Sequence, residues 1–322
     1  MRVGTISYAT TQGLGVLAKS FFDAGVLTDI LIVEHHCRPT HFDWFPGADS
    51  TLSKPMDLDK ARAFIDGLDT LLVFETPFHW SLMEYAINKG VLTALMPMYE
   101  CMPRKLPVKP HRILCPSRLD LKYYPEGVYI PVPVEEPFRQ RTRAEVFVHN
   151  SGNGGLWGRN GTVELIAAMT YVESPLKLVI RSQKPIKADR HDERIEFMLH
   201  EVPREDLYQT GDVFVFPEKF NGLSLPLQEA FASGMLVMAT DRFPNDTYLP
   251  KEALIPVSQY EMGRIGGCQP FRSAVVNPRD IALMMDRWYG QDITLQSSIG
   301  QQYGETNSWA ALKPRYMEAL TP

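Results

Sequence analysis

Cysteine is scarce in this sequence of 322 residues, and none of its four cysteines belongs to a C-x-x-C pair. This spacing excludes a disulfide framework and a paired-cysteine zinc site, and it indicates a reducing compartment. Long apolar runs are also missing. No stretch approaches the roughly 20 residues that span a bilayer, and the amino terminus lacks the apolar core of a secretory signal. We therefore expect a cytoplasmic protein without an integral membrane segment.

Positive charge is in deficit, since 33 Lys and Arg residues face 38 Asp and Glu residues and leave a net charge of -5. This balance argues against a protein that coats nucleic acid or anionic membranes through its bulk charge, although a local basic patch remains compatible with it. Short-period repeats, heptads and low-complexity tracts are missing as well, which argues against solenoid and coiled-coil architectures.

The first half of the chain alternates between short β-branched runs and helical patterns. Strands are predicted at 3–8, 30–34, 71–75, 91–97 and 113–116, with helices such as 14–22 and 80–89 between them. This alternation builds a parallel sheet covered on both faces, and such sheets bind ligands at the carboxyl ends of their strands.

A proline-rich and charged segment, IPVPVEEPFRQRTR, ends this first alternation and predicts an extended connector. A second alternation follows, with strands predicted at 145–149, 176–181, 194–198, 212–217 and 235–240 and helices at 162–171 and 225–232. The length of the chain also favours two domains of about 150 residues each. We expect a first α/β domain over 1–140, a second over 141–300, and a final helix over 301–322.

The most informative segment is DVFVFPEKFNGLSLPLQEAFASGMLVMATD, which begins at Asp212. It predicts a buried strand, a glycine loop, a helix and a second buried strand. Backbone amides of such a loop converge on the positive end of the helix dipole, so the loop suits an anion or sugar hydroxyls.

This segment resembles the donor motif of the retaining GT-B glycosyltransferases of family four, roughly E-G-F-G-L-P-x-x-E-A-x-A-x-G-x-P-V. The matching positions are Asn221, Gly222, Leu223, Ser224, Leu225, Pro226, Glu229, Ala230, Ala232, Gly234 and Val237. The resemblance implies two Rossmann-like domains, an acceptor-side domain first and a nucleotide-sugar domain second, and a final helix that returns to the first domain. It also implies that Glu229 binds the ribose of the donor.

The first acid of the family motif is Asn221 in this chain. An asparagine can hydrogen-bond a sugar hydroxyl but cannot supply a negative charge. A gapped alignment that recruits Glu218 instead shifts the glycine loop by three residues, and we rank it second. Retention of the anomeric configuration is therefore expected only loosely.

Three weaker stretches are similar to the same family: YIPVPVEEPFRQ to its entry into the second domain, EVFVHNSGNGGLWGRNGTVELIAAM to its opening strand, loop and helix, and NSWAALKPRYMEAL to its final helix. In the second stretch, Gly152 and Gly154 predict a loop that approaches the donor diphosphate, and Arg159 supplies a positive charge. The family's lysine is Asn160 here, so Arg181 or Lys184 is expected to replace its charge. Arg181 also fits an ordinary exposed ion pair.

The first predicted strand leads into TTQGLGVLA, where Gly13 and Gly15 predict a turn whose amides approach a donor phosphate or an acceptor. The same pattern and Glu34 also fit a nicotinamide oxidoreductase. Gly13 stands several residues beyond the strand, whereas the dehydrogenase turn is tight. The oxidoreductase therefore stays an alternative rather than the main hypothesis.

Two further loops, ETPFHW and MPMYECMP, follow predicted strands of the first domain. They place Glu75, His79, Tyr99 and Glu100 where an acceptor enters. His79 and Glu100 could orient or deprotonate an acceptor hydroxyl, and Glu75 and Tyr99 could contact the acceptor. A structural role fits each of the four equally well.

Two patterns suggest a metal ion, but neither predicts one. The turn from His35 to His41 is too short to point four ligands at one ion. Asp57 and Asp59 imitate the D-x-D motif of single-domain glycosyltransferases, but they precede a helical pattern and are expected to cap it. We expect no metal and no cofactor beyond a nucleoside diphosphate sugar as donor substrate.

One dense basic region lies in the first domain, with Arg104, Lys105, Lys109, Arg112, Arg118 and Lys122. A solvated loop explains it, and so does a polyanionic acceptor such as a phosphorylated glycan, a lipid-linked sugar or DNA with a hydroxylated base. The compact length also suits the small glycosyltransferases of phages. Taken together, the sequence predicts a hexosyl- or pentosyltransferase acting on a hydroxyl acceptor. The alternatives are an NAD-dependent oxidoreductase and a non-catalytic sugar-nucleotide-binding protein.

Overall fold

A computed structural model of the chain describes all residues except 153–157, 187–191 and 201. The chain divides into two compact units. Unit 1 comprises Met1–Val132, Arg264–Gln269 and Trp309–Pro322, and unit 2 comprises Pro133–Gly263 and Pro270–Ser308.

Unit 2 begins at Pro133, within the connector and before the expected boundary between the domains at residue 140. Arg141 explains this, because its guanidinium is only 2% exposed and donates hydrogen bonds to the carbonyls of Arg139, Tyr208, Gly211 and Ser233. The amide of Arg139 also donates to Ser233 O at 3.0 Å. The segment before Arg141 is thereby bound to unit 2 rather than left as a free linker.

Unit 1 is built on a parallel sheet whose strand order is β3-β2-β1-β4-β5-β6-β7. The bounds in that order are Ser50–Leu52, Asp29–Glu34, Val3–Tyr8, Thr70–Glu75, Leu92–Pro97, Arg112–Cys115 and Val128–Tyr129. The order reverses between β1 and β4, where crevices form at the carboxyl ends of strands in such sheets.

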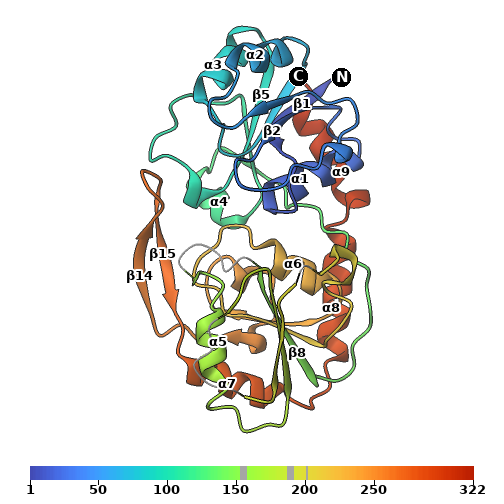
Figure 1. Ribbon diagram of the computed structural model, residues 1–322, viewed down its shortest axis with the longest axis vertical. Helices are drawn as coiled ribbons and strands as arrows, with labels where there is room; N and C mark the ends of the chain where they lie inside the picture. Colours follow the sequence, from blue (N-terminus) through green and yellow to red (C-terminus); the bar gives the residue numbers. More distant parts are fainter. Residues whose placement is uncertain (153–157, 187–191, 201) are drawn as a thin grey trace. The chain divides into compact units, whose positions relative to one another are not determined.

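Helices cover both faces of this sheet (Figure 1). They are α1 (Gly13–Asp23), α2 (Leu58–Asp66), α3 (Trp80–Asn88), α4 (Arg118–Tyr123) and α9 (Trp309–Leu320). Residues of β2 and β4 alternate between the faces, as the period of a strand requires. Leu31 and Val73 pack with α2 and α3, whereas Phe74 meets Phe21 of α1, which also contacts Trp309 of α9.

The predicted cap of α2 is confirmed. The Asp57 carboxylate accepts hydrogen bonds from the amides of Asp59 and Lys60 at 3.1 and 2.9 Å. The pattern that imitates a metal motif therefore begins a helix.

Unit 2 repeats the architecture with the strand order β10-β9-β8-β11-β12-β13, again with parallel pairs. The bounds in that order are Ile195–Met198, Lys177–Ser182, Val146–Gly152, Val213–Phe216, Leu236–Thr240 and Leu254–Ile255. Its helices are α5 (Thr162–Ala168), α6 (Leu225–Ala232), α7 (Pro278–Trp288) and α8 (Thr294–Thr306). Phe147 and Val215 pack with α5 and α7, whereas Phe214 and Val237 pack with α6.

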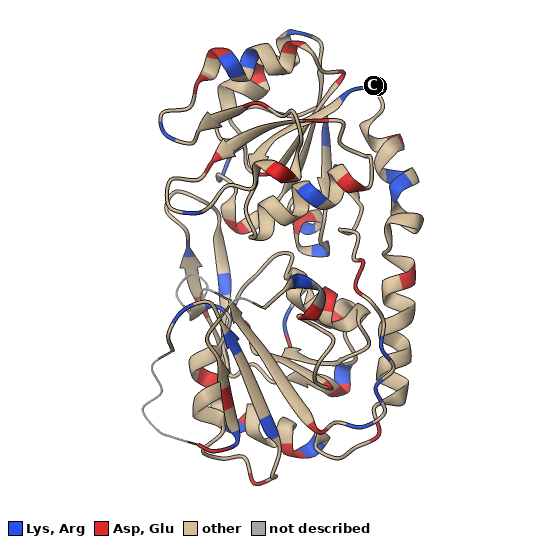
Figure 2. Cartoon of the chain, turned by 45° about the vertical axis from the view of Figure 1, so that its right-hand side comes forward, with Lys and Arg blue, Asp and Glu red and all other residues tan. Residues whose placement is uncertain are grey.

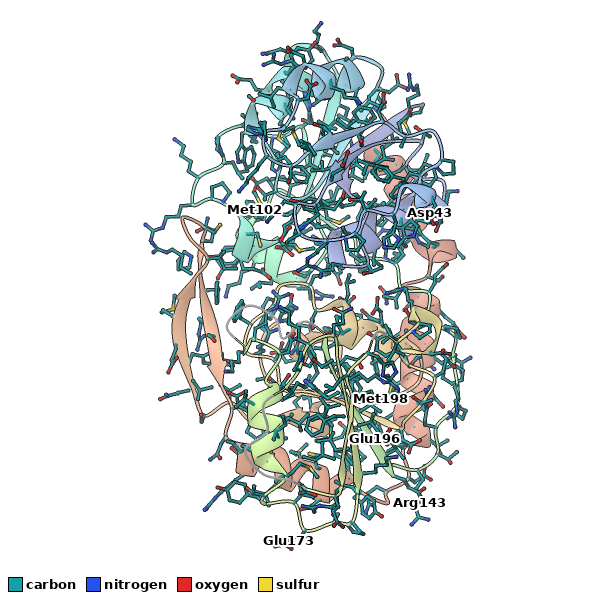
Figure 3. The ribbon with its side chains drawn as sticks, viewed as in Figure 1. Asp43, Met102, Arg143, Glu173, Glu196 and Met198 are labelled. Carbon is teal, nitrogen blue, oxygen red and sulfur yellow. The ribbon has the colours of Figure 1, made fainter. Side chains whose placement is uncertain are left out.

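A two-stranded sheet of β14 (Gln259–Arg264) and β15 (Pro270–Val275) stands apart from both large sheets. The short 3-10 helices are Phe42–Trp44, Tyr99–Cys101, Arg204–Asp206, Asn245–Thr247 and Lys251–Ala253. Lys and Arg are interspersed with Asp and Glu along the helices of both units (Figure 2), and Met102 is fully buried among the side chains of unit 1 (Figure 3). Within the described ranges, no helix is long and apolar enough to cross a bilayer.

Candidate functional site

The donor-motif loop of unit 2 joins β11 to α6 and is held by its own side chains. Asn221 Oδ1 accepts hydrogen bonds from the amides of Leu223 and Ser224 at 3.2 and 3.1 Å. Ser224 caps α6 with a left-handed backbone, at φ 48° and ψ 59°. Two of the amides expected to hold sugar or phosphate thus donate to the Asn221 carboxamide oxygen, and Gly222, which precedes them, is buried.

Glu218 lies beneath this loop and is 1% exposed. Its carboxylate pairs with Arg242, and it accepts hydrogen bonds from Ser224 Oγ at 2.7 Å and from Asn245 Nδ2 at 3.3 Å. Arg242 Nη2 also donates to the carbonyl of Asn221 at 3.0 Å. The acid that a gapped alignment would recruit is therefore buried in an ion pair, and it fixes the loop from below.

Glu229 of α6 is 7% exposed, so it is not a solvated helix glutamate. Arg204 Nη2 donates to its Oε1 at 2.7 Å, and the Tyr208 hydroxyl donates to its Oε2 at 2.8 Å. Burial, followed by the charge of Glu229, raises the pKa of Tyr208 well above its usual range. Each oxygen of Glu229 therefore has one strong donor and keeps capacity for another.

A second acid, Glu136, shares the same guanidinium. Its Oε1 lies 3.1 Å from Arg204 Nη2, and its side chain is 4% exposed. Burial and the nearby charge of Glu229 raise the pKa of Glu136 to about 8, against the opposing effect of Arg204. Arg204 and Tyr208 carried no motif signal in the sequence, and Glu136 belongs to the stretch similar to the family's entry into the second domain, 68 residues before Arg204. Only the fold brings them to Glu229.

Arg181, expected at the donor diphosphate, is 5% exposed on β9. Its guanidinium donates to the carbonyl of Leu207 and to Thr210 Oγ1, and burial lowers its pKa. This geometry corrects the expectation of a strand-end cation that faces a ligand. Arg181 instead supports the segment that carries Tyr208.

Arg159 is partly exposed and lies with its guanidinium carbon 6.0 Å from the centre of the Phe220 ring. Its carbonyl accepts from the amide of Lys219 at 2.7 Å, next to the donor-motif loop. Gly161 follows closely, and a Cβ on it would lie 2.2 Å from Pro217 O. The glycine lets the start of α5 approach the end of β11, which places Arg159 beside that loop.

Gly152 ends β8 at φ 55°, and its carbonyl accepts from the amide of Gln183 at 2.8 Å. Gly154 lies outside the described residues. Lys184 is exposed, and its amide donates to Ser182 Oγ at 3.2 Å. Gly152 and Lys184 therefore sit on the adjacent ends of β8 and β9, at the carboxyl edge of the sheet.

In unit 1, Gly13 opens α1 with no other atom within 4 Å of a Cβ built on it. Gly15 is constrained, because a Cβ there would lie 2.1 Å from Thr10 O. The turn after β1 therefore needs glycine at the second position and leaves space at the first, at the carboxyl end of a central strand.

The four expected acceptor-side residues divide into two pairs. Tyr99 and Glu100 are 5% and 4% exposed in a 3-10 helix, and Tyr99 stacks on Tyr123 with ring centres 3.5 Å apart. Glu75 ends β4 and is partly exposed, and His79 precedes α3 and is exposed. The first pair is part of the interior, and the second pair lies at the carboxyl edge of the sheet.

Asp120 is a buried acid that the sequence pattern did not reveal. Its carboxylate accepts from Ser117 Oγ at 2.5 Å and from the Tyr99 amide at 2.9 Å, and it is 0% exposed. Burial raises the pKa of Asp120 to about 7, and the charge of Glu100 adds to the rise against the opposing Ser117 hydrogen bond. Two acids thus lie close together beneath the end of β5.

The turn after β2 brings His35, His36 and Cys37 together, with potential ligand atoms within 4.8 Å of one another. Burial lowers the pKa of His35, and the charges of Arg38 and His36 lower it further. Three ligand groups meet here, rather than the four that a closed structural zinc site uses.

All six cations of the basic region of unit 1 are exposed, and three of them contact other groups of the chain. Arg112 donates to the carbonyl of Thr321 at 3.2 Å, and Arg118 and Lys122 lie over the rings of Tyr129 and Tyr123. Three exposed cations remain together on the loop before β6: Arg104, Lys105 and Lys109.

No protein-family model matches the chain, and no curated protein matches its sequence. Solved structures do match. HepE of Anabaena, solved in complex with UDP and glucose, matches with a TM-score of 0.67 and 8% identity over 99% of each chain. A glycosyltransferase from Rickettsia africae matches with a TM-score of 0.66 and 12% identity, over 99% of this chain and 98% of its own.

The lipopolysaccharide outer core galactosyltransferase WaaB matches with a TM-score of 0.63 and 12% identity, over 99% of this chain and 98% of its own. These matches extend over nearly the whole of each protein, and the two parallel α/β units account for them. The chain therefore has the GT-B fold of two Rossmann-like domains.

Proposed function

We propose that this chain is a glycosyltransferase that moves a sugar from a nucleoside diphosphate sugar to a hydroxyl acceptor. The observation that carries the proposal is Glu229, a buried carboxylate on the helix that follows the donor-motif loop. The GT-B fold supports it, and so does the presence of UDP and glucose in the matching HepE structure. The resemblance to family four suggests retention of the anomeric configuration.

Glu229 binds the ribose in this proposal. Arg204 and Tyr208 each occupy one acceptor position of the carboxylate and hold it in place. A carboxylate offers about four acceptor positions. One position therefore remains on each oxygen, which matches two neighbouring hydroxyl donors such as those of a ribose.

The reaction forms a bond between the acceptor hydroxyl oxygen and the anomeric carbon of the donor sugar. The bond from that carbon to the diphosphate oxygen breaks, the hydroxyl proton is released, and the nucleoside diphosphate leaves with the electron pair. Arg159 and Lys184 are the cations that we assign to this developing negative charge. We assign Arg181 to the support of Tyr208 instead. No step needs a metal ion or cofactor, and the transferred group is a hexose or pentose.

A non-catalytic sugar-nucleotide-binding protein is the second candidate, and the donor-motif loop favours it specifically. Asn221 replaces the first motif acid, and its side chain is bonded to the loop's own amides. Glu218 cannot replace that acid, because it pairs with Arg242. Donor binding without hydrolysis or transfer, unchanged in Asn221→Glu, would favour this second candidate.

Calorimetric titration with UDP, GDP, ADP and NAD tests the proposal. We expect one nucleoside diphosphate to bind and NAD to bind no better than ADP, whereas selective binding of NAD would support an oxidoreductase. The variants Glu229→Gln and Glu229→Ala should then weaken binding of that diphosphate by roughly 1.5–3 kcal/mol, because a charged hydrogen-bond acceptor for ribose is lost.

Glu173→Ala is the matched control, since Glu173 is an exposed acid on the surface of unit 2 (Figure 3). Its affinity should equal that of the wild type. Circular dichroism of each variant separates a lost contact from a lost fold. Unchanged affinity in a folded Glu229→Gln protein contradicts the assigned role.

A further inference from the structure

Two residues other than glycine have a left-handed backbone within the described part of the chain. They are Ser224, at φ 48°, and Glu75, at φ 60°. Side chains disfavour this conformation, and residues that keep it cluster at ligand sites, where the surroundings enforce it. Ser224 lies in the donor-motif loop of unit 2. Glu75 is the last residue of β4, the strand whose place in the sheet order of unit 1 corresponds to that of β11 in unit 2.

The neighbours of Glu75 enforce its position. β4 pairs with β5 up to Glu75 itself, which lies opposite Pro97. The thiol of Cys101 hydrogen-bonds to the Glu75 carboxylate, and burial and this carboxylate both raise the pKa of the thiol. The contact with Cys101 therefore fixes the direction of the Glu75 side chain, which stays partly exposed.

Aromatic rings from three adjacent strand ends gather beside this carboxylate. Tyr8 ends β1, His35 follows β2, and Phe78 follows β4, and these three strands are neighbours in the sheet. The Tyr8 ring centre lies 5.0 Å from His35 and 5.0 Å from Phe78. Tyr8 and Glu75 end the neighbouring strands β1 and β4, and burial followed by the charges of Glu75 and Cys37 raises the pKa of Tyr8. All three rings are partly exposed.

We propose that Tyr8, His35, Phe78 and Glu75 form a binding site for the sugar ring of a carbohydrate acceptor. This inference rests on the proposed function and narrows the acceptor class. Aromatic faces carry negative charge density and pack against the C–H groups of a sugar ring. The Glu75 carboxylate accepts a hydrogen bond from a sugar hydroxyl, which is a strong contact because the acceptor is charged.

The same carboxylate opposes an anionic group at this position. A phosphate placed on the Tyr8 ring would face the like charge of Glu75 at short range. Arg38 acts on His35 of this site, and the exposed cations Arg104, Lys105 and Lys109 lie on the loop before β6. The sugar ring in contact with Glu75 is therefore uncharged, even if a more distant part of the acceptor carries phosphate.

The first test isolates the backbone conformation of Glu75. Glu75→Gly and Glu75→Ala both remove the carboxylate, but only glycine adopts a positive φ freely. We expect the glycine variant to have the higher Tm in thermal unfolding. At an ordinary strand position, alanine would be at least as stable, so a higher Tm for the alanine variant overturns the argument from backbone conformation.

The second test measures transfer by the full chain. Radiolabelled UDP-glucose, UDP-galactose and UDP-N-acetylglucosamine are supplied with a panel of immobilised neutral oligosaccharides, of phosphorylated oligosaccharides and of duplex DNA. We expect the wild type to label a neutral oligosaccharide. Glu75→Gln should lower that rate about tenfold to a hundredfold and leave the Kd for UDP unchanged, because its site lies in unit 1. Phe78→Ala should mainly raise the acceptor KM.

Glu84→Gln is the matched control, since Glu84 is an exposed acid on α3 of the same unit. Failure of the wild type to bind any of UDP, GDP and ADP contradicts the proposed function itself. Three results in a protein that binds UDP overturn the present inference alone: no labelled neutral oligosaccharide, label confined to DNA or phosphorylated sugars, and full transfer by Glu75→Gln.

Discussion

The buried acids of the two units are satisfied in different ways. In unit 2, Glu218 pairs with Arg242 and Glu229 pairs with Arg204. In unit 1, the buried carboxylate of Asp120 accepts instead from a serine hydroxyl and a backbone amide. A guanidinium gives an acid a fixed geometry and a charged partner, whereas neutral donors let an acid take up a proton. Glu218 and Glu229 of unit 2 are thus held by charged partners, whereas Asp120 of unit 1, like Glu136 beside Arg204, has a pKa raised to near neutrality.

Breaking the ion pair between Arg242 and Glu218, beneath the donor-motif loop, should cause the largest loss of stability. Arg242→Met leaves Glu218 buried without its cation, which destabilises proteins by about 3–5 kcal/mol. Urea unfolding followed by hydrogen exchange of α6 peptides measures the loss. Lys177→Met is the control, because Lys177 forms an exposed pair with Glu196 and should change stability by less than about 1 kcal/mol. Equal effects of the two variants would contradict the contrast.

Asp120 predicts a pH dependence for unit 1. Its pKa is about 7 in the folded chain, against 3.8 for an ordinary aspartate, so the folded state alone holds the proton between these values. Stability therefore falls as pH rises from 4 to 7, by up to about 4 kcal/mol. Asp120→Asn mimics the protonated acid and should flatten this dependence of stability on pH. Hydrogen exchange of peptides from β5 and β6 measures it. Asp66→Asn, at a partly exposed position on α2, should leave the slope intact.

His149 contributes the opposite dependence at β8 of unit 2, whereas Glu136 of the same unit contributes one in the direction of Asp120. The ring is fully buried on β8, with Nδ1 2.8 Å from Val215 O and Nε2 2.8 Å from Thr162 Oγ1, and burial lowers its pKa to about 4. Only the unfolded chain binds a proton between pH 6.5 and 4, so the stabilisation present above pH 6.5 is lost as pH falls, by up to about 3 kcal/mol.

Hydrogen exchange of β8 peptides, measured from pH 7 to 4, checks this fall in stability. His149→Asn should flatten it even though the substitution lowers stability at every pH. His200→Asn, at an exposed position of the same unit, should not. A slope retained in His149→Asn would assign the acid sensitivity of unit 2 to other groups.

Most of the fold was predictable from the sequence, because long buried strands leave a pattern that tertiary contacts reinforce. The predicted strand at 3–8 is β1, and the predicted helix at 225–232 is α6. β14 was missed because its residues are mainly exposed, so no alternation of apolar and polar residues marks it. The boundary between the units falls inside the predicted connector, but unit 2 begins at Pro133 rather than at 141. The four carbonyls bound by the buried Arg141 have no signature in sequence.

Residues of the candidate site were predictable from the sequence only where they belong to a recognisable motif. Glu229 stands on a motif, but its partners Arg204 and Tyr208 come from a separate loop. Arg181 was expected to face a ligand because it lies near the end of a strand. Only the fold shows that its guanidinium donates a hydrogen bond to the carbonyl of Leu207 instead. Asn221 could be recognised as a substitution, whereas its hydrogen bonds to the loop amides depend on the turn that follows.

Gly15 and Gly161 bear on how relatives of this chain can be found. A side chain at either position would overlap the carbonyl of Thr10 or Pro217, so the backbone itself imposes these two residues. Surface and core side chains can drift during divergence as long as volume and polarity are kept. A search profile that gives heavy weight to both glycines and to Glu229, and little to the positions between them, should therefore recover distant homologues that overall similarity misses.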